Sequence, residues 1–218
     1  MSRLTTLAIS LCVITALWVG LCPDGASARR FTPVVDPGGK ALQQFHRSLK
    51  RTAKGLGRTR IMQYGASHTE ADLLTGYLRQ FFQSRFGDAG HGYVMPATPW
   101  KGYRHQDVQI ACSDGWFTDK AYRKKSRRDG LYGLAGFSVA SANTDDYAWV
   151  ATSQKSKFGR RVSQFDVFYL RQPEGGSFDI YVDDEHYLKA RTDHTGTGLG
   201  VRTIRVADGA HELRVQPR

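Results

Sequence analysis

The chain has 218 residues and a formal net charge of +11, and its length suffices for one large domain or two small ones with a substantial core. Hydrophobic residues make up 40% and charged residues 23% of the sequence, as in an ordinary globular protein. The sequence contains no zinc-finger spacing, aromatic ribonucleoprotein motif or basic-zipper heptad, which argues against a nucleic-acid partner. We interpret the charge as solvated surface with weak attraction to an anionic envelope.

The N-terminus has the pattern of a secretory signal peptide. Arg3 supplies a positive start, Leu7 to Leu21 an apolar run, and Ala26-Ser27-Ala28 a small-residue cleavage site. A membrane anchor and a lipoprotein at Cys22 are the alternatives, but the apolar run is short for a span of ~20 residues, and a large residue precedes the cysteine. We therefore predict that residues 1–28 are a signal peptide and that the mature protein is extracytoplasmic, either periplasmic or secreted.

Removal of the signal peptide would leave one of the three cysteines, Cys112. No intrachain disulfide can then form, and we expect this residue to be a buried small hydrophobe. The histidines are scattered, and Cys112 has no partner at ligand spacing, so the sequence predicts no metal site. The glycine-rich stretch Gly87–Gly92 follows a predicted helix, whereas a nucleotide-binding loop would follow a strand, and we expect no cofactor.

A predicted nucleophile turn follows an amphipathic helix over Lys40–Lys54. Ile61 to Tyr64 is typical of a short buried strand, and Gly65 to His68 of a tight turn. A long helix is then expected to run to about Phe86. Its apolar positions recur at helical spacing: Leu73, Leu74, Tyr77, Leu78, Phe81 and Phe82. A serine at such a junction would present its hydroxyl beside the first free amides of the helix.

Two readings of Ser67 stay open. The spacings Ser67-x-x-Glu70 and Thr69-x-x-Asp72 both fit a capping box, in which a hydroxyl only satisfies an amide at the helix start. In the other reading Ser67 is a catalytic nucleophile and its own backbone amide is an oxyanion donor. His68 is adjacent on the turn and points away from Ser67, so we expect it to line the site without acting as the base.

The turn Gly65-Ala66-Ser67-His68 and the residues after it resemble the first motif block of the SGNH, or GDSL-like, hydrolases. The likeness is to the subgroup related to peptidoglycan O-acetylesterases and extends to about Pro99. It implies an α/β fold for residues 29–112, the N-terminal part of a flavodoxin-like three-layer domain. It also implies that Ser67 is the nucleophile, that Gly65 and His68 line the site, and that the substrate is an acetylated polysaccharide or peptidoglycan. Ala66 departs from the family pattern, which has an aspartate that could hold the turn.

Residues 113–218 change character, with short alternating segments separated by turn residues. We predict strands at 136–141, 148–152, 165–171, 177–182, 188–192, 201–206 and 212–215, with hairpin turns at 174–176 and 207–210. This spacing indicates an antiparallel, jelly-roll-like β-sandwich. The segment resembles the carbohydrate-binding-module-like insert of the same subgroup. The aromatic residues that could stack on sugars are Trp116, Tyr122, Tyr132, Trp149, Tyr169 and Tyr187, although most are expected to pack in the core.

The family's catalytic base lies in a late Asp-x-x-His block, and the chain is expected to be truncated before that block. Asp183-Asp184-Glu185-His186 matches the spacing, but its position between two alternating segments indicates a hairpin turn. The sequence therefore predicts an exported esterase that is weakly active or inactive alone. The alternatives are a non-catalytic glycan or cell-wall binding protein and, less favoured, a basic structural protein of the envelope.

Overall fold

The computed structural model describes residues 34–121 and 127–218, and the chain divides into two compact units, residues 1–43 and 44–218. The predicted signal peptide and part of the basic stretch Lys120–Arg128 lie outside the described residues. In the first unit, the Asp36 carboxylate accepts hydrogen bonds from the backbone amides of Lys40 and Ala41, at 3.3 and 3.0 Å. All of the described strands belong to the second unit.

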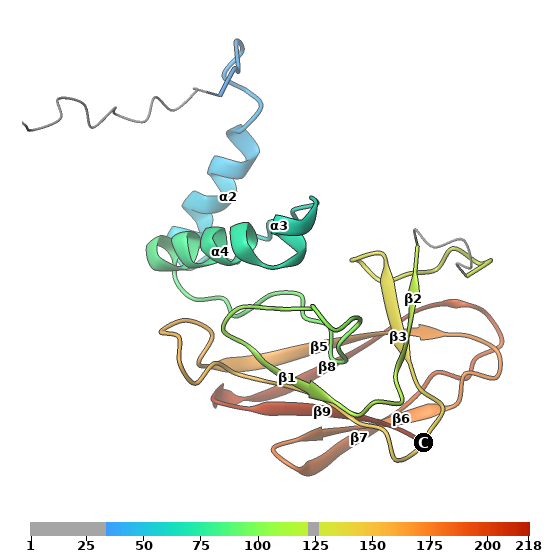
Figure 1. Cartoon of the computed structure of the whole chain (residues 1–218). Helices are drawn as coiled ribbons and strands as arrows, with labels where there is room; N and C mark the ends of the chain where they lie inside the picture. Colours follow the sequence, from blue (N-terminus) through green and yellow to red (C-terminus); the bar gives the residue numbers. More distant parts are fainter. Residues whose placement is uncertain (1–33, 122–126) are drawn as a thin grey trace, which may run out of the picture. The chain divides into compact units, whose positions relative to one another are not determined.

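The second unit contains a five-stranded antiparallel sheet with the strand order β1-β4-β9-β6-β7 (Figure 1). Its strands are β1 (Gln109–Cys112), β4 (Ala148–Ala151), β9 (Glu212–Pro217), β6 (Ser177–Val182) and β7 (Glu185–Arg191). In β9 the residues Leu213, Val215 and Pro217 are buried alternately, the period expected of a strand with one covered face. β1 precedes the predicted domain boundary at 112/113 and pairs with β4 beyond it.

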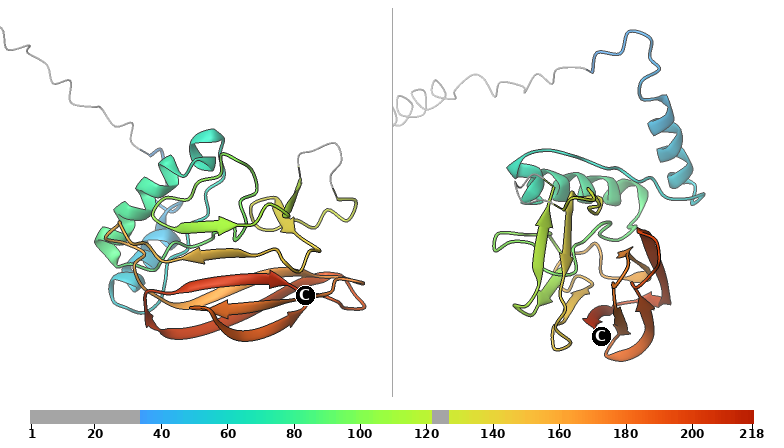
Figure 2. Two further views of the ribbon diagram at one scale, coloured as in Figure 1. Left: turned by 60° about the horizontal axis from the view of Figure 1, so that its bottom comes forward. Right: turned by 90° about the vertical axis from the view of Figure 1, so that its right-hand side faces the viewer.

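A long two-stranded ribbon, β5 (Val162–Arg171) and β8 (Gly198–Gly209), lies against one face of this sheet (Figures 1 and 2). The fully buried side chains Ile180 and Ile204 come from the sheet and the ribbon respectively. Phe165 and Val167 of β5 pack against the same cluster, which also includes Leu213. The described residues therefore form a sandwich-like core between the sheet and the ribbon.

A second pair of strands, β2 (Phe117–Lys120) and β3 (Phe137–Ala140), forms a separate antiparallel sheet. Val139 packs against the main core, and the Trp100 ring lies 5.0 Å from the Phe137 ring, centroid to centroid. Half-buried Cys112 also packs against this core as a free thiol, and its Sγ accepts a hydrogen bond from the Thr98 amide at 3.4 Å. The expectation of a small hydrophobe is therefore met only in part.

The predicted strands between residues 136 and 218 are confirmed, but two predicted hairpins are wrong. Residues 174–176 connect β5 to β6, and residues 207–210 lead from β8 to β9, yet neither pair of strands is hydrogen-bonded. Both segments carry the chain between the ribbon and the sheet. The turn between β6 and β7 is a hairpin, as predicted, and its central residues Asp183 and Asp184 have φ angles of 51° and 66°. Positive φ at both positions is the geometry of a type I′ turn.

In the described part of the chain, three helices precede the strands: α2 (Gln43–Ala53), α3 (Ser67–Glu70) and α4 (Leu73–Phe86). The helix predicted to follow the turn is interrupted, because Asp72 adopts a left-handed conformation (φ 54°, ψ 28°) between α3 and α4. Phe82 of α4 packs edge-to-face on Phe45 of α2, with 5.9 Å between ring centroids. Within the described residues, no helix is long and apolar enough to cross a membrane.

The predicted three-layer α/β fold is wrong, because residues 34–121 and 127–218 are β-rich and form sheets of five, two and two strands in which all pairs are antiparallel. The predicted buried strand over Ile61–Tyr64 is an extended, non-strand segment with Ile61 52% and Tyr64 75% exposed. Residues 57–65 make no backbone-to-backbone hydrogen bond with the described chain. A lone segment without neighbouring strands cannot form a parallel sheet, and the described strands pair among themselves. The stretch Gly87–Val94, which the resemblance placed before a second parallel strand, is likewise irregular.

Candidate functional site

A surface hollow of about 630 Å³ lies where α4 meets the loop that leads into β1. The wall contributed by the start of α4 is apolar, whereas the loop contributes several planar polar side chains. The lining residues are Ala71, Leu73, Gly102, Tyr103, Arg104, His105, Gln106, Val108 and Ile110. A concave site with apolar walls and a few convergent polar groups is suited to a small organic ligand.

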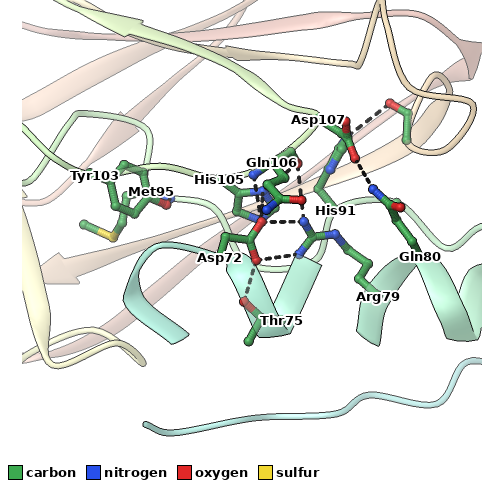
Figure 3. Close-up of polar contacts among 12 residues, drawn as sticks. Asp72, Thr75, Arg79, Gln80, His91, Met95, Tyr103, His105, Gln106 and Asp107 are labelled. Atoms are coloured by element: carbon green, nitrogen blue, oxygen red, sulfur yellow. Dashed lines mark hydrogen bonds and ion pairs between the residues drawn. The ribbon is translucent and has the colours of Figure 1, made fainter. Parts of the chain in front are cut away.

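Asp72 lies between the lining residues Ala71 and Leu73 and is only 6% exposed; Figure 3 shows its polar contacts. Its carboxylate accepts two hydrogen bonds from the Arg79 guanidinium, at 2.6 and 3.2 Å, and one from the Thr75 hydroxyl at 2.5 Å. It also accepts the backbone amide of Gln106 at 2.7 Å. Burial by itself raises the pKa of Asp72, but the hydrogen bonds from Arg79 and Thr75 outweigh it and leave the pKa below its ordinary value. The ionised carboxylate thus clamps the first turns of α4 to the loop.

His105 lies next to this clamp with a side chain that is 8% exposed. Its Nδ1 is 3.2 Å from the Gln106 carbonyl oxygen and 3.6 Å from a carboxylate oxygen of Asp72. Burial, followed by the nearby positive charge of Arg79, lowers the pKa of His105 to about 4. Its Nε2 makes no hydrogen bond with the described residues and is not fully buried. The site therefore holds a neutral imidazole with one ring nitrogen left open.

A second set of contacts ties α4 to the loop between β4 and β5. Gln83 donates to the Asp88 carboxylate at 2.8 Å, and Asp88 also accepts the Gly159 amide at 2.6 Å. The His91 ring packs edge-to-face on His105 with 5.5 Å between centroids, and its Nε2 lies 3.3 Å from the Gly159 carbonyl. Burial lowers the pKa of His91 as well. Gly159 has φ +66°, and a Cβ there would lie 2.0 Å from His91, so only glycine fits.

Ser67 occupies the first position of α3 and is exposed. The N-cap of α3 is Ala66, and neither α3 nor α4 has a side-chain cap hydrogen bond, so neither predicted capping box forms. Within the described chain, the Ser67 hydroxyl has no hydrogen-bond partner, and its backbone amide meets no backbone acceptor. Its carbonyl accepts the Ala71 amide at 2.9 Å, which places Ser67 one helical turn before a residue that lines the hollow.

Gly65 and His68, the two residues predicted to line the site, have different surroundings. His68 is exposed, and its side chain makes no hydrogen bond, ion pair or ring contact with the described residues. Gly65 lies against Thr69, whose hydroxyl oxygen would be 2.3 Å from a Cβ at that position. Gly65 is therefore required for the close approach of the turn to α3. His186 of the segment Asp183–His186 follows the hairpin turn on β7, and its Nε2 lies 3.3 Å from a carboxylate oxygen of Asp179.

Sequence reasoning missed the Asp72 clamp and His105. Asp72, Thr75 and Arg79 are spaced so that the three polar side chains lie on one face of a helix. This spacing is visible in the sequence between the apolar residues of the same helix and could have indicated the clamp. His105 is 33 residues from Asp72 in the sequence, and no local pattern joins them.

Among residues 34–121 and 127–218, no group of three or more His, Cys, Asp or Glu side chains is placed to hold a metal ion. No protein-family model matches the chain, and no curated protein matches its sequence.

Proposed function

We propose that the protein is an exported ester hydrolase of low turnover that removes acetyl groups from a polysaccharide or peptidoglycan, with Ser67 as its nucleophile. The observation that carries the proposal is the placement of Ser67, whose exposed hydroxyl makes no hydrogen bond to the described chain, one helical turn before Ala71 in the hollow that His105 also lines. The resemblance of the turn Gly65–His68 to a hydrolase motif supports the same assignment.

The proposed chemistry uses His105 as the base. The Ser67 oxygen forms a bond to the acetyl carbonyl carbon while its proton passes to Nε2 of His105. The bond from that carbon to the sugar oxygen then breaks, and the proton is returned to the sugar. Water cleaves the acetyl-serine by the same route and releases acetate. The step requires Ser67 Oγ and His105 Nε2 to come within about 2.6–3.2 Å of each other when substrate is bound.

The environment of His105 makes this base available but weak. With a pKa of about 4, the imidazole is neutral and able to accept a proton throughout the neutral range. The same low pKa disfavours the imidazolium that forms in the transition state, and efficient bases have a pKa near the working pH. Asp72, with a carboxylate oxygen 3.6 Å from Nδ1, favours the imidazolium, but burial and the positive charge of Arg79 outweigh it. We expect slow turnover for this reason.

Ser67→Ala tests the proposal directly. We expect it to lower the rate of acetyl-ester hydrolysis at least roughly tenfold, because the covalent route is lost. Ser84→Ala is the matched control, since Ser84 is an exposed serine on α4 whose hydroxyl only donates to the Phe81 carbonyl at 2.8 Å. The parent rate should stay level from about pH 8 to pH 5 and fall near pH 4, where His105 becomes protonated. Equal rates for parent and Ser67→Ala would refute the assignment.

Non-catalytic glycan binding is a second candidate, favoured by a hollow of about 350 Å³ at the β6–β7 hairpin. Asp183, Glu185, His186 and Tyr187 line it and combine planar hydrogen-bonding groups with an aromatic ring. Of the described aromatic residues predicted to stack on sugars, Trp116, Tyr132, Trp149 and Tyr169 are partly buried, whereas Tyr187 is 44% exposed. Tyr122 lies outside the described residues.

For this candidate, Tyr187→Ala is expected to weaken retention on insoluble cell-wall material about fivefold or more, because a stacking face is lost. Phe117→Ala is the control, since Phe117 is 56% exposed on β2 and lies outside the hollow. Ser67→Ala should leave this retention unchanged. A drop in binding for Phe117→Ala equal to that for Tyr187→Ala would mean that the hollow is not the binding site.

A further inference from the structure

The helix α4 has its polar face inward and an apolar face outward. Gly76 and Gln83 are buried, and Arg79 is engaged by Asp72. In contrast, the apolar side chains expose large fractions to solvent: Leu73 55%, Leu74 45%, Tyr77 65% and Phe81 41%. These four residues recur along one side of the helix, and we call them the α4 apolar face. A surface helix normally covers such a stripe, so this face is unpartnered within the described chain.

The extended segment before α3 enlarges this apolar surface. Ile61 is 52%, Met62 60% and Tyr64 75% exposed. In Figures 2 and 3 the chain between α2 and α3 runs along α4 on the side that faces away from the strands. Exposed aromatic and aliphatic side chains therefore occur both on the segment and on α4. Tyrosine and phenylalanine are the side chains that partition into a membrane interface.

The same part of the chain carries an uncompensated positive charge. Between Gln44 and Gly65 there are six lysines and arginines and no acidic residue. All six side chains are exposed, and none forms an ion pair with the described residues: Arg47, Lys50, Arg51, Lys54, Arg58 and Arg60. On α4, Arg85 lies 5.6 Å over the Phe81 ring, at the end of the apolar face. Apolar side chains and unpaired cations thus come together on two neighbouring segments.

The unpaired positive charge indicates which kind of partner could cover the α4 apolar face. A second copy of the chain would bring two sets of unpaired cations together, and their repulsion opposes self-association. A neutral apolar partner would leave the cations without counterions. An anionic lipid surface satisfies both features, because apolar side chains enter the interface while lysine and arginine contact the head groups. We infer that the α4 apolar face and residues 44–65 dock the protein on an anionic lipid bilayer.

The inference does not depend on ester hydrolysis, and vesicle binding tests it. The full chain is sedimented with vesicles of phosphatidylcholine alone and with vesicles containing about 30% phosphatidylglycerol, the anionic component that attracts basic segments. We expect binding to the anionic vesicles at least roughly tenfold tighter than to the neutral ones, and weaker binding in high salt. Arg58→Glu/Arg60→Glu should remove most of this difference, because each cation near the surface contributes about fivefold.

Leu74→Ser/Tyr77→Ser should weaken binding to anionic vesicles at least roughly tenfold, because two inserted side chains are lost. The matched control is Phe168→Ser/Leu199→Ser, which removes side chains that are 50% and 64% exposed on the ribbon. All of these variants share residues 1–33, so any contribution of the apolar run Leu7–Leu21 is common to them.

A gain of signal complements these losses. Tyr77→Trp should keep the affinity and, compared with the parent and its four tryptophans, add emission that brominated lipids quench. Hydrolysis should be unchanged in Leu74→Ser/Tyr77→Ser when the substrate is soluble, which separates this inference from the proposed function. Equal binding of the parent and Leu74→Ser/Tyr77→Ser overturns the inference. Binding to soluble polyglutamate as tight as to anionic vesicles would also overturn it and would instead indicate an acidic protein partner.

Discussion

Replacing Asp72 with alanine is expected to lower the free energy of unfolding by roughly 3–5 kcal/mol, the usual cost of removing one partner of a buried ion pair. The side chain of Asp72 is 8% exposed and that of Arg79 is 16% exposed, at a separation of 2.6 Å. Without the carboxylate, the guanidinium keeps only the Gln106 carbonyl at 3.3 Å as a described acceptor. The Thr75 hydroxyl and the Gln106 amide lose their acceptor as well. Urea denaturation of parent and variant measures the difference.

Two further variants separate charge from geometry. Asp72→Asn preserves the side-chain shape and tolerates the left-handed backbone at φ 54°, so it should cost less than Asp72→Ala. Asp208→Ala removes an ion pair with Arg161 of similar length, 2.9 Å, but both of its side chains are more than 60% exposed. The expected loss there is under about 1 kcal/mol. A loss for Asp72→Ala as small as that for Asp208→Ala would contradict the role of the clamp.

Acidification is expected to destabilise the protein by roughly 3 kcal/mol through His105 alone, from the difference between a pKa of 6.5 and one of about 4. The folded state holds this imidazole neutral, whereas the unfolded chain binds a proton near pH 6.5. Between these values the unfolded state carries more protons, so stability is fully present above pH 6.5 and falls as the pH drops toward 4. The pKa of His91 is also lowered, which adds to the slope in the same direction.

His211 acts in the opposite direction, because its hydrogen bond to Asp183 raises its pKa. Its stabilisation is present below pH 6.5 and is lost as the pH rises through the folded-state value. The diagnostic experiment is therefore a comparison of variants in urea at pH 7 and pH 4.5. His105→Gln should flatten the decline, whereas His46→Gln, on an exposed helix position, should leave it as in the parent. An unchanged decline in His105→Gln would show that another group is responsible.

The β-rich half of the protein could be predicted from the sequence because its signals are local. Alternation of residues such as Leu213 and Val215 indicates a strand wherever it occurs, and the polar pair Asp183-Asp184 indicates a two-residue turn. Strand pairing is not local. The turns at 174–176 and 207–210 have hairpin composition, yet each joins two different sheets, because β6 and β9 pair with each other in the five-stranded sheet whereas β5 and β8 pair in the ribbon. Turn residues specify a change of direction and not a partner.

In the helical half, the sequence predicts that a helix forms but not which of its faces is buried. The apolar spacing of Leu74, Tyr77 and Phe81 correctly indicates a helix, but it does not say that the helix packs through its polar side. That orientation comes from Asp72, which accepts hydrogen bonds from Arg79 and from Gln106 far along the chain. The strand expected at Ile61–Tyr64 fails for the same reason, since a strand exists only with a partner. Ser67 could be singled out from its turn, whereas His105 could be placed beside the hollow only by the structure.

Covalent labelling of Ser67 is the measurement that tests the proposed function most directly. A small fluorophosphonate, which reacts with activated serine hydroxyls, is incubated with the full chain, and peptides are identified by mass spectrometry. We predict a label on Ser67, slower labelling in His105→Gln, and no label at that peptide in Ser67→Ala. Exposed serines such as Ser84 should remain unlabelled, because exposure alone does not activate a hydroxyl. A chain that takes up no label at Ser67, or labels Ser84 equally, would contradict the assignment of Ser67 as a nucleophile.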